Sequence, residues 1–431
     1  MLPTCRSHLA IALPLLILAL LAPPAGAATG FDVDAATQAY LATLGGAARA
    51  RSDAYFEGGY WITLWSALVA VTVDLVQLRT GLSARWRDWA ERVTRRRFPQ
   101  AMLYALPYVL VGALLSLPWT IYTGFVRELH YGLMNQSFAG WLGDALINLA
   151  IAMVLSAIML GILMIGLRRS PRRWWLWGTG VVAAALAALM LIAPVFIAPL
   201  FNSYTELAPG PVRERIVAMA AAHHVPADHI YVFDQSRQDK RISANVSGLG
   251  PTIRISLNDN LLSRTTLPET AAVMGHELGH YVLGHVWRLI IGLSLAVGLA
   301  LWATSRIARA LIARHGAAWR LRGPDDLAAV PVYLMTIIAL MLLLTPLTNS
   351  IARASESEAD AFGLDAAREP DGFASVAMKL AEYRKIAPGR IEEIMFYDHP
   401  SGATRVRMAM QWKKDHVPGA HMVTPPPLPQ D

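Results

Sequence analysis

Six apolar segments, each close to the length that crosses a lipid bilayer, constrain this chain more than any other feature. They lie at residues 59–78, 101–122, 143–167, 174–200, 286–306 and 328–350. A membrane-spanning helix needs about 20 apolar residues, and only helices and closed barrels satisfy their backbone hydrogen bonds within lipid. The chain is 16% charged, whereas soluble domains carry about 25% charged residues. The sequence therefore predicts a mainly α, polytopic membrane protein in contact with the bilayer.

The amino terminus carries a further apolar stretch, from Leu9 to Leu21, behind Arg6. The small residues Ala25-Gly26-Ala27 follow it and suit cleavage by signal peptidase. We therefore expect residues 1–27 to be a signal peptide, with an uncleaved first membrane span as the alternative. The protein would have six membrane helices after cleavage, or about seven if this segment is retained.

Two polar regions interrupt the apolar segments. The first combines a helical pattern with short β-like runs at 230–233 and 253–257, and it ends in a predicted helix over 270–285. We expect a small α+β unit here. A run of three prolines near the carboxyl terminus indicates a disordered tail. The predicted organisation is a signal peptide or first span at 1–27, a transmembrane helical region at 28–200, an α+β region at 201–285, two further spans at 286–350, a second polar region at 351–414 and the tail at 415–431.

The arginines of the loops alternate along the chain. Loop 79–100 holds seven arginines, loop 168–173 holds four and segment 306–322 holds five, whereas the intervening loop 123–142 holds only Arg127. Short arginine-rich loops stay on the cytoplasmic side of a membrane. The sequence therefore places both polar regions on the extracytoplasmic side. Because arginine in such loops explains the net charge of +7, we expect no nucleic-acid partner.

The residues His276-Glu277-Leu278-Gly279-His280 form an H-E-x-x-H motif. On a helix the two histidines share one face and can bind one Zn²⁺ at about 2.0–2.1 Å. Glu277 can act as general base toward water held at the metal and pass the proton to the leaving amine. With 12 histidines in the chain, chance produces this pattern in about one such chain per hundred. We interpret His285, five residues after His280, as a structural residue turned away from the ligands.

A catalytic zinc ion needs a third protein ligand, and an acidic cluster after the last span offers one. Glu356 and Asp360 are four residues apart and share a helix face, whereas Glu358 points away from both. We predict that Glu356 binds the metal and that Asp360 orients a ligand histidine. The alternative for such a cluster alone is a solvated helix start; the H-E-x-x-H motif favours the ligand.

A third element is Asp398-His399-Pro400, with Arg405 six residues after His399. Two cationic side chains near a zinc site can stabilise the oxyanion of a tetrahedral intermediate. On the residues alone, a surface turn followed by a basic helix is the stronger interpretation.

Together these residues resemble the type I CAAX prenyl protease family of integral-membrane zinc metalloendopeptidases. The resemblance covers most of the chain after the signal-like segment. It is carried by Leu117-Pro118-Trp119, Ile197-Ala198-Pro199-Leu200-Phe201, Asp259-Asn260-Leu261-Leu262, the stretch from His276 to His285, Glu356-Ser357-Glu358-Ala359-Asp360, and His399-Pro400 with Arg405.

The resemblance implies seven helices that enclose a large water-filled chamber within the membrane, with the zinc site lining it and a metallopeptidase domain made from residues 201–285 and 351–414. It implies His276, His280 and Glu356 as metal ligands, and Glu277 as the base. It further implies that Asp360 supports a ligand, and that His399 and Arg405 lie beside the reacting carbonyl. Asn245 resembles the asparagine of a family strand that pairs with substrate backbone, a common way to bind extended peptides.

We therefore expect a zinc endopeptidase that processes, or removes as quality control, membrane-associated peptides or proteins. The arginine pattern and the signal-like segment suggest a bacterial inner membrane, with the active site on the extracytoplasmic side. The alternative from another class is a non-proteolytic membrane scaffold or transporter with a structural zinc ion. A structural site would be closed by four protein ligands, and the sequence offers no convincing fourth.

Overall fold

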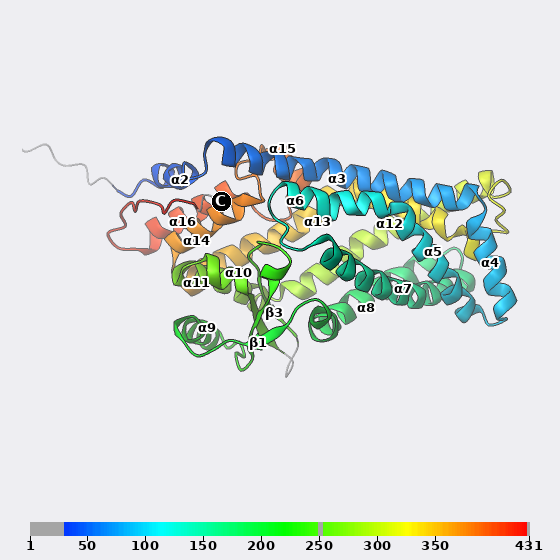
Figure 1. The fold of residues 1–431 in the computed structure, drawn as a ribbon, viewed down its shortest axis with the longest axis horizontal. Coiled ribbons are helices and arrows are strands. Elements are labelled where there is room, and N and C mark those ends of the chain that lie inside the picture. The colour runs from blue at the N-terminus through cyan, green and yellow to red at the C-terminus, as the bar shows by residue number, and fades with distance from the viewer. Residues whose placement is uncertain (1–29, 249–252, 429–431) are drawn as a thin grey trace, which may run out of the picture.

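Six long helices dominate the computed structural model, which describes residues 30–248 and 253–428 (Figure 1). Within these residues they are the helices long and apolar enough to cross a membrane, as predicted. Five of them extend beyond their apolar segments, whereas the fourth coincides with the segment 174–200. The region expected to be a signal peptide lies outside the described residues. The six helices are α3 (Gly46–Arg79), α5 (Arg97–Ile121, continued by η1, Tyr122–Val126, and α6, Arg127–His130), α7 (Phe138–Arg169), α8 (Trp174–Ile192, continued by η2, Ala193–Ile197, and η3, Ala198–Leu200), α12 (His285–His315) and α13 (Val330–Ala367, preceded by η6, Leu327–Ala329).

These helices close into a ring. Each packs against two others, in the order α3, α5, α7, α8, α12, α13 and back to α3. Small residues allow close approach between neighbours: a Cβ atom on Gly298 of α12 would lie 2.9 Å from Thr179 Oγ1 of α8. Such contacts are typical of membrane helices. Because apolar side chains are as well solvated by lipid as by protein, these helices associate through close packing at small residues rather than through the hydrophobic effect. Accordingly, none of the most apolar stretch of α8 is buried within the protein.

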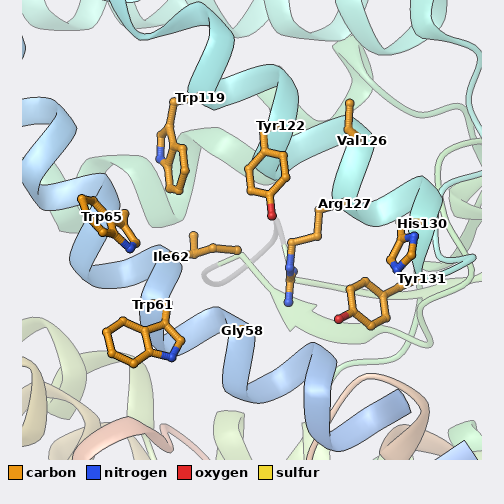
Figure 2. A pocket seen from close by; sticks show the side chains of 10 residues that line it. All are labelled: Gly58, Trp61, Ile62, Trp65, Trp119, Tyr122, Val126, Arg127, His130 and Tyr131. Carbon is orange, nitrogen blue, oxygen red and sulfur yellow. The ribbon is translucent and has the colours of Figure 1, made fainter.

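A cavity of about 650 Å³ opens between α3 and the continuous helix α5–η1–α6. Figure 2 shows that aromatic side chains from both helices, among them Trp61, Trp65 and Trp119, surround it together with Arg127. The Arg127 guanidinium lies 4.0 Å from the centre of the Tyr55 ring. It also forms an ion pair with Glu128, which in turn binds Arg241 at 2.6 Å. The polar side of the cavity is thereby joined to the segment that leads into the small sheet.

The small sheet has the strand order β1-β2-β4-β3. Its strands are β1 (Tyr204–Glu206), β2 (Ile230–Phe233), β3 (Ala244–Ser247) and β4 (Arg254–Asn258). Strands β2 and β4 lie where the sequence predicts strands and are parallel, whereas β1 and β3 pair antiparallel at the two edges. Buried Ile255 and Leu257 of β4 share one core with Ile216 of helix α9 (Pro211–Ala222) and with Met274 and Leu278 of helix α11 (Leu267–Val282). The sheet thus supports one side of α11.

Short helices from both ends of the chain cover the other side of α11 (Figure 1). A second core joins Tyr40 to Ala272 of α11, Phe373 and Val406. Residues 417–428 contain no helix or strand, but Val423 and Leu428 pack against this core. The remaining helices are α2 (Val33–Leu41), α4 (Leu82–Val93), η4 (Gln235–Arg237), α10 (Asp259–Arg264), α14 (Pro370–Lys379), η7 (Leu380–Glu382), α15 (Arg390–Phe396) and α16 (Gly402–His416).

Candidate metal centre

Helix α11 carries the H-E-x-x-H motif, and its first turn is held firmly. Thr266 and Glu269 form a capping box, in which the Thr266 backbone N–H donates to Glu269 Oε2 at 2.7 Å. The same carboxylate accepts hydrogen bonds from Lys379 at 2.7 Å and from Ser375 at 2.5 Å, both on α14. Capping satisfies backbone donors that a helix start otherwise leaves free. The buried Glu269–Lys379 pair therefore fixes α11 against the carboxyl-terminal helices.

Helices α11 and α13 meet backbone to backbone at two glycines. A Cβ atom on Gly275 would lie 2.9 Å from the Gly363 carbonyl oxygen, and a Cβ atom on Gly363 would lie 2.8 Å from the His276 backbone nitrogen. Real Cβ atoms are excluded at such distances, so the crossing depends on both glycines. This close approach brings the acidic residues of α13 within reach of the α11 histidines.

Three potential ligand atoms converge at this crossing. His276 Nε2 lies 3.1 Å from His280 Nε2 and 3.3 Å from Glu356 Oε2, and His280 Nε2 lies 3.5 Å from Glu356 Oε1. Ligands bound tetrahedrally at about 2.1 Å stand about 3.4 Å apart. Glu356 Oε2 is buried and receives no hydrogen bond within the described part of the chain. The donor set, its spacing and this unsatisfied oxygen fit a divalent metal ion.

A second carboxylate supports His276 from behind. Asp360, fully buried, lies 2.8 Å from His276 Nδ1 through its Oδ1 atom. Arg405 of α16 donates to both oxygens of Asp360, at 2.9 and 2.5 Å. Burial lowers the pKa of His276, but the bond to Asp360 and the nearby Glu356 carboxylate outweigh it and raise the pKa to about 9. Asp360 therefore orients the His276 imidazole so that Nε2 points at the other potential ligand atoms. Arg405 binds Asp360 and does not lie on the open side of the site, where the sequence interpretation placed it.

His280 has a comparable support that the sequence interpretation missed. Helix α11 ends at Val282, and Gly284 turns the chain with a φ of 65°, so that buried His285 begins α12 and reaches back. His285 Nδ1 lies 3.0 Å from His280 Nδ1, and its Nε2 lies 3.3 Å from Glu358 Oε2. The i+5 spacing suggested that His285 turns away, but that argument assumed an unbroken helix. The glycine before His285 was the available signal.

Glu277 stands apart from these contacts. It is half-buried, and within the described residues its carboxylate forms no hydrogen bond or ion pair. Burial raises the pKa of Glu277, and the nearby Glu356 adds to this, whereas His276 and His280 oppose it. A carboxylate of raised pKa that is free of partners is suited to accept and return a proton.

The other residues singled out from the sequence lie close by. His399 Nε2 is 3.2 Å from Glu356 Oε2, and His399 Nδ1 is 2.8 Å from Asp398. The group of mutually close ligand atoms contains His276, His280 and Glu356, and His399 is outside it. Asn245 lies on β3, which packs against α11 and is an edge strand of the sheet. Its backbone is therefore available on one side to another extended chain.

Comparisons with known proteins agree with this geometry. Residues 207–413 match the model of peptidase family M48, and residues 43–203 match the model of the CAAX prenyl protease N-terminal domain with five membrane helices. The chain is 27% identical to the uncharacterized metalloprotease YhfN of Bacillus subtilis over 80% of both chains.

The chain is also similar to eukaryotic proteins over shorter stretches. It is 28% identical to the probable CAAX prenyl protease 1 of Schizosaccharomyces pombe, over 52% of this chain and 50% of that protein. It is also 28% identical to the CAAX prenyl protease 1 homolog of Arabidopsis thaliana, over 68% of this chain and 69% of that protein. The fold is similar to the crystal structure of S. mikatae Ste24p, with a TM-score of 0.69 at 20% identity, covering 88% of this chain and 96% of that one.

Proposed function

Because this chain belongs to peptidase family M48 and is an integral-membrane metalloprotease, we propose that it hydrolyses peptide bonds with one zinc ion held by His276, His280 and Glu356. The observation that carries the proposal is the convergence of two imidazole nitrogens and the Glu356 carboxylate, with N–N and N–O distances of 3.1–3.5 Å. Two imidazoles and one carboxylate are a common catalytic zinc set, which leaves one position for water or substrate. A zinc ion in such a set polarises a peptide carbonyl and makes water acidic enough to attack at neutral pH.

The residues around the ligands then have distinct tasks. Glu277 takes a proton from the attacking water as the new C–O bond forms, and delivers it to the nitrogen as the C–N bond breaks. His399 lies beside Glu356, on the side of the site where we propose that the substrate binds. It donates a hydrogen bond to the developing oxyanion. Asp360 holds His276, and Arg405 holds Asp360, so that Arg405 positions the site rather than touching substrate.

We propose that the substrate binds along strand β3. An extended peptide that adds to the free edge of β3 would be held by backbone hydrogen bonds, with Asn245 contributing its side chain. The aromatic cavity between α3 and α5 adjoins the same region through Arg241 and Glu128. We propose that it admits peptides with apolar or membrane-associated segments into a chamber within the ring of helices.

The membrane orientation follows from the arginines. The metal centre and the arginine-rich loops lie at opposite ends of the long helices, with α4 at one end and α11, α14 and α16 at the other (Figure 1). If the arginine-rich end is cytoplasmic, the site faces the extracytoplasmic side of a bacterial inner membrane. The proposed substrates are therefore processed or misfolded membrane-associated proteins on that side.

The proposal is tested by metal analysis of the purified protein together with cleavage of an unstructured peptide. We expect one zinc ion per chain, loss of cleavage on treatment with a chelator, and recovery with added zinc. His280→Ala should purify with less than a tenth of the wild-type zinc, because two ligands hold a catalytic metal poorly. Stoichiometric zinc in His280→Ala, or cleavage unaffected by chelation, would contradict the assignment. A scaffold or transporter with a structural metal is not favoured, since the ligand group found among residues 30–248 and 253–428 holds three residues rather than four.

A further inference from the structure

A second cavity, of about 370 Å³, lies at the arginine-rich end of the membrane helices, remote from the metal centre. Its lining comes from the start of α5 and the end of α7 and consists of Arg97, Phe98, Gly161, Ile165, Arg168 and Arg169. Neither the proposed reaction nor the peptide site uses these residues. Three arginines therefore lie beside apolar side chains where the helices leave the membrane. This combination suits a ligand that has both an anionic group and an apolar group.

The three arginines of this cavity have no directly paired carboxylate, although Asp325, Asp326 and Glu91 lie near enough to Arg168 to favour its charged form. Within the described residues, none of them forms an ion pair with a carboxylate. Arg168 Nη1 donates to the Arg97 carbonyl oxygen at 3.4 Å, which holds the two side by side across the two helices. Like charges gathered in this way repel each other unless an anion lies between them.

Carboxylates at the same end are already engaged by other arginines. Arg322 binds Asp88 at 2.9 Å and Glu91 at 2.8 Å. Arg87 binds Asp326 at 2.5 Å, and both side chains of this pair are buried. At this end the protein therefore pairs Arg87 and Arg322 directly with carboxylates, whereas the cavity arginines have carboxylates only at longer range.

The first turn of α5 adds to the attraction for an anion. The helix begins at Arg97, and no side chain caps it. The backbone N–H groups of a helix start carry a partial positive charge and bind anionic oxygens readily. Pro99 has no N–H, so this turn offers the N–H groups of Arg97 and Phe98. The Arg168 guanidinium reaches the carbonyl oxygen of Arg97 in the same turn.

The apolar part of the cavity distinguishes a lipid from a free anion. Phe98 is 38% exposed and Ile165 is 43% exposed, although both lie beside charged residues. The Phe98 ring rests directly on α7, since a Cβ atom on Gly161 would lie 2.6 Å from it. A free phosphate gains nothing from this wall, whereas an acyl chain would cover it. We propose that the cavity binds the headgroup phosphate of an anionic phospholipid, with an acyl chain against Phe98 and Ile165.

The test uses the full-length protein released from detergent in native mass spectrometry, with phosphatidylglycerol or phosphatidylcholine added. One variant combines Arg97→Gln, Arg168→Gln and Arg169→Gln. Its matched control combines Arg95→Gln, Arg172→Gln and Arg173→Gln, which removes the same charge from exposed arginines at the same end but outside the cavity. We expect wild type and control to retain phosphatidylglycerol over phosphatidylcholine, and the cavity variant to bind it about tenfold or more weakly.

Three results would overturn the proposal. The first is an equal loss in both variants, which would indicate general attraction between charges. The second is unchanged retention in the cavity variant. The third is displacement of the lipid by millimolar inorganic phosphate, which would indicate a phosphate site. Should the triple variant fail to fold, Arg169→Gln alone, at an exposed position, must still reduce retention relative to Arg172→Gln.

Discussion

A Cβ atom on Gly363 of α13 would lie 2.8 Å from the backbone nitrogen of His276 on α11. Asp360 and Glu356 precede Gly363 by about one and two helical turns on α13. The depth of this helix crossing therefore decides whether the carboxylates meet the histidines. The proposed metal centre therefore depends on Gly275 and Gly363 as much as on its proposed ligands.

Gly363→Ala should consequently damage the metal centre without altering a ligand. The new methyl group meets backbone, which yields only if the helices separate, so we expect a loss of about 1–3 kcal/mol in stability and weaker zinc binding. Thermal unfolding and zinc content measure the two effects. Gly143→Ala is the matched control, because it is also helical and its Cβ would meet open space. A Gly363→Ala protein with normal zinc content would show that the crossing is not limiting.

His285 should tune metal affinity through His280. Removing a residue that orients a metal ligand typically weakens binding about 10–100-fold, and we expect His285→Ala to do so while His285→Gln recovers part of the affinity. Competition with a chromogenic chelator gives the dissociation constant. His421→Ala, at an exposed histidine, serves as control. Equal affinity in His285→Ala and wild type would reduce His285 to a packing residue.

Metal binding should release protons at neutral pH. The Asp360 and Glu356 carboxylates raise the pKa of His276 to about 9, so its imidazole is protonated in the metal-free protein at pH 7 and must lose that proton to bind zinc. Zinc affinity should therefore rise as the pH increases from 7 to 9 and level off above. Calorimetry in two buffers of different ionisation enthalpy counts the protons. Asp360→Asn should release fewer, and an unchanged count would contradict the assigned cause.

Glu269 should contribute to stability in a pH-dependent way. Burial alone would raise its pKa, but hydrogen bonds from Lys379, Ser375 and the Thr266 backbone outweigh this and lower the pKa below 4.5. Its stabilising effect is therefore present above pH 4.5 and is lost as the pH falls through the lower folded-state pKa. Glu269→Gln leaves the partly buried Lys379 without its carboxylate partner, at a cost of about 1–3 kcal/mol.

Thermal unfolding of wild type and Glu269→Gln, from pH 7 down through the folded-state pKa of Glu269 below pH 4.5, measures this effect. The difference between them should be largest at neutral pH and narrow on acidification. Glu214→Gln, at an exposed position in α9, should unfold like wild type throughout. A gap that stays constant with pH would mean that Glu269 acts through packing alone.

The sequence predicts the membrane helices well because continuous apolar stretches leave few alternatives. It also predicts the His276–His280 pair, because helix geometry alone places residues four apart on one face. The position of His285 was missed because it depends on a left-handed turn at Gly284. The pairing of Arg405 with Asp360 was missed because it depends on how α16 packs against α13, and no local pattern reports a contact between residues 45 positions apart.

The arginine-lined cavity shows the same limit. The sequence marks loops 79–100 and 168–173 and segment 306–322 as basic, but it does not show which arginines pair with carboxylates. Arg87 and Arg322 do, whereas Arg97 and Arg169 do not. That division follows from the arrangement of α4, α5 and α7 around one end of the ring. The roles assigned to the metal-centre residues remain predictions until they are tested by substitution.

The central claim is that Glu277 moves the proton during peptide hydrolysis without binding the metal. Zinc content and peptide cleavage measured together on Glu277→Gln test it most directly. The account predicts one zinc ion per chain, as in wild type, and cleavage reduced by about 100-fold or more, since general acid–base catalysis contributes 10²–10⁴-fold. Cleavage at the wild-type rate, with zinc bound, would contradict it.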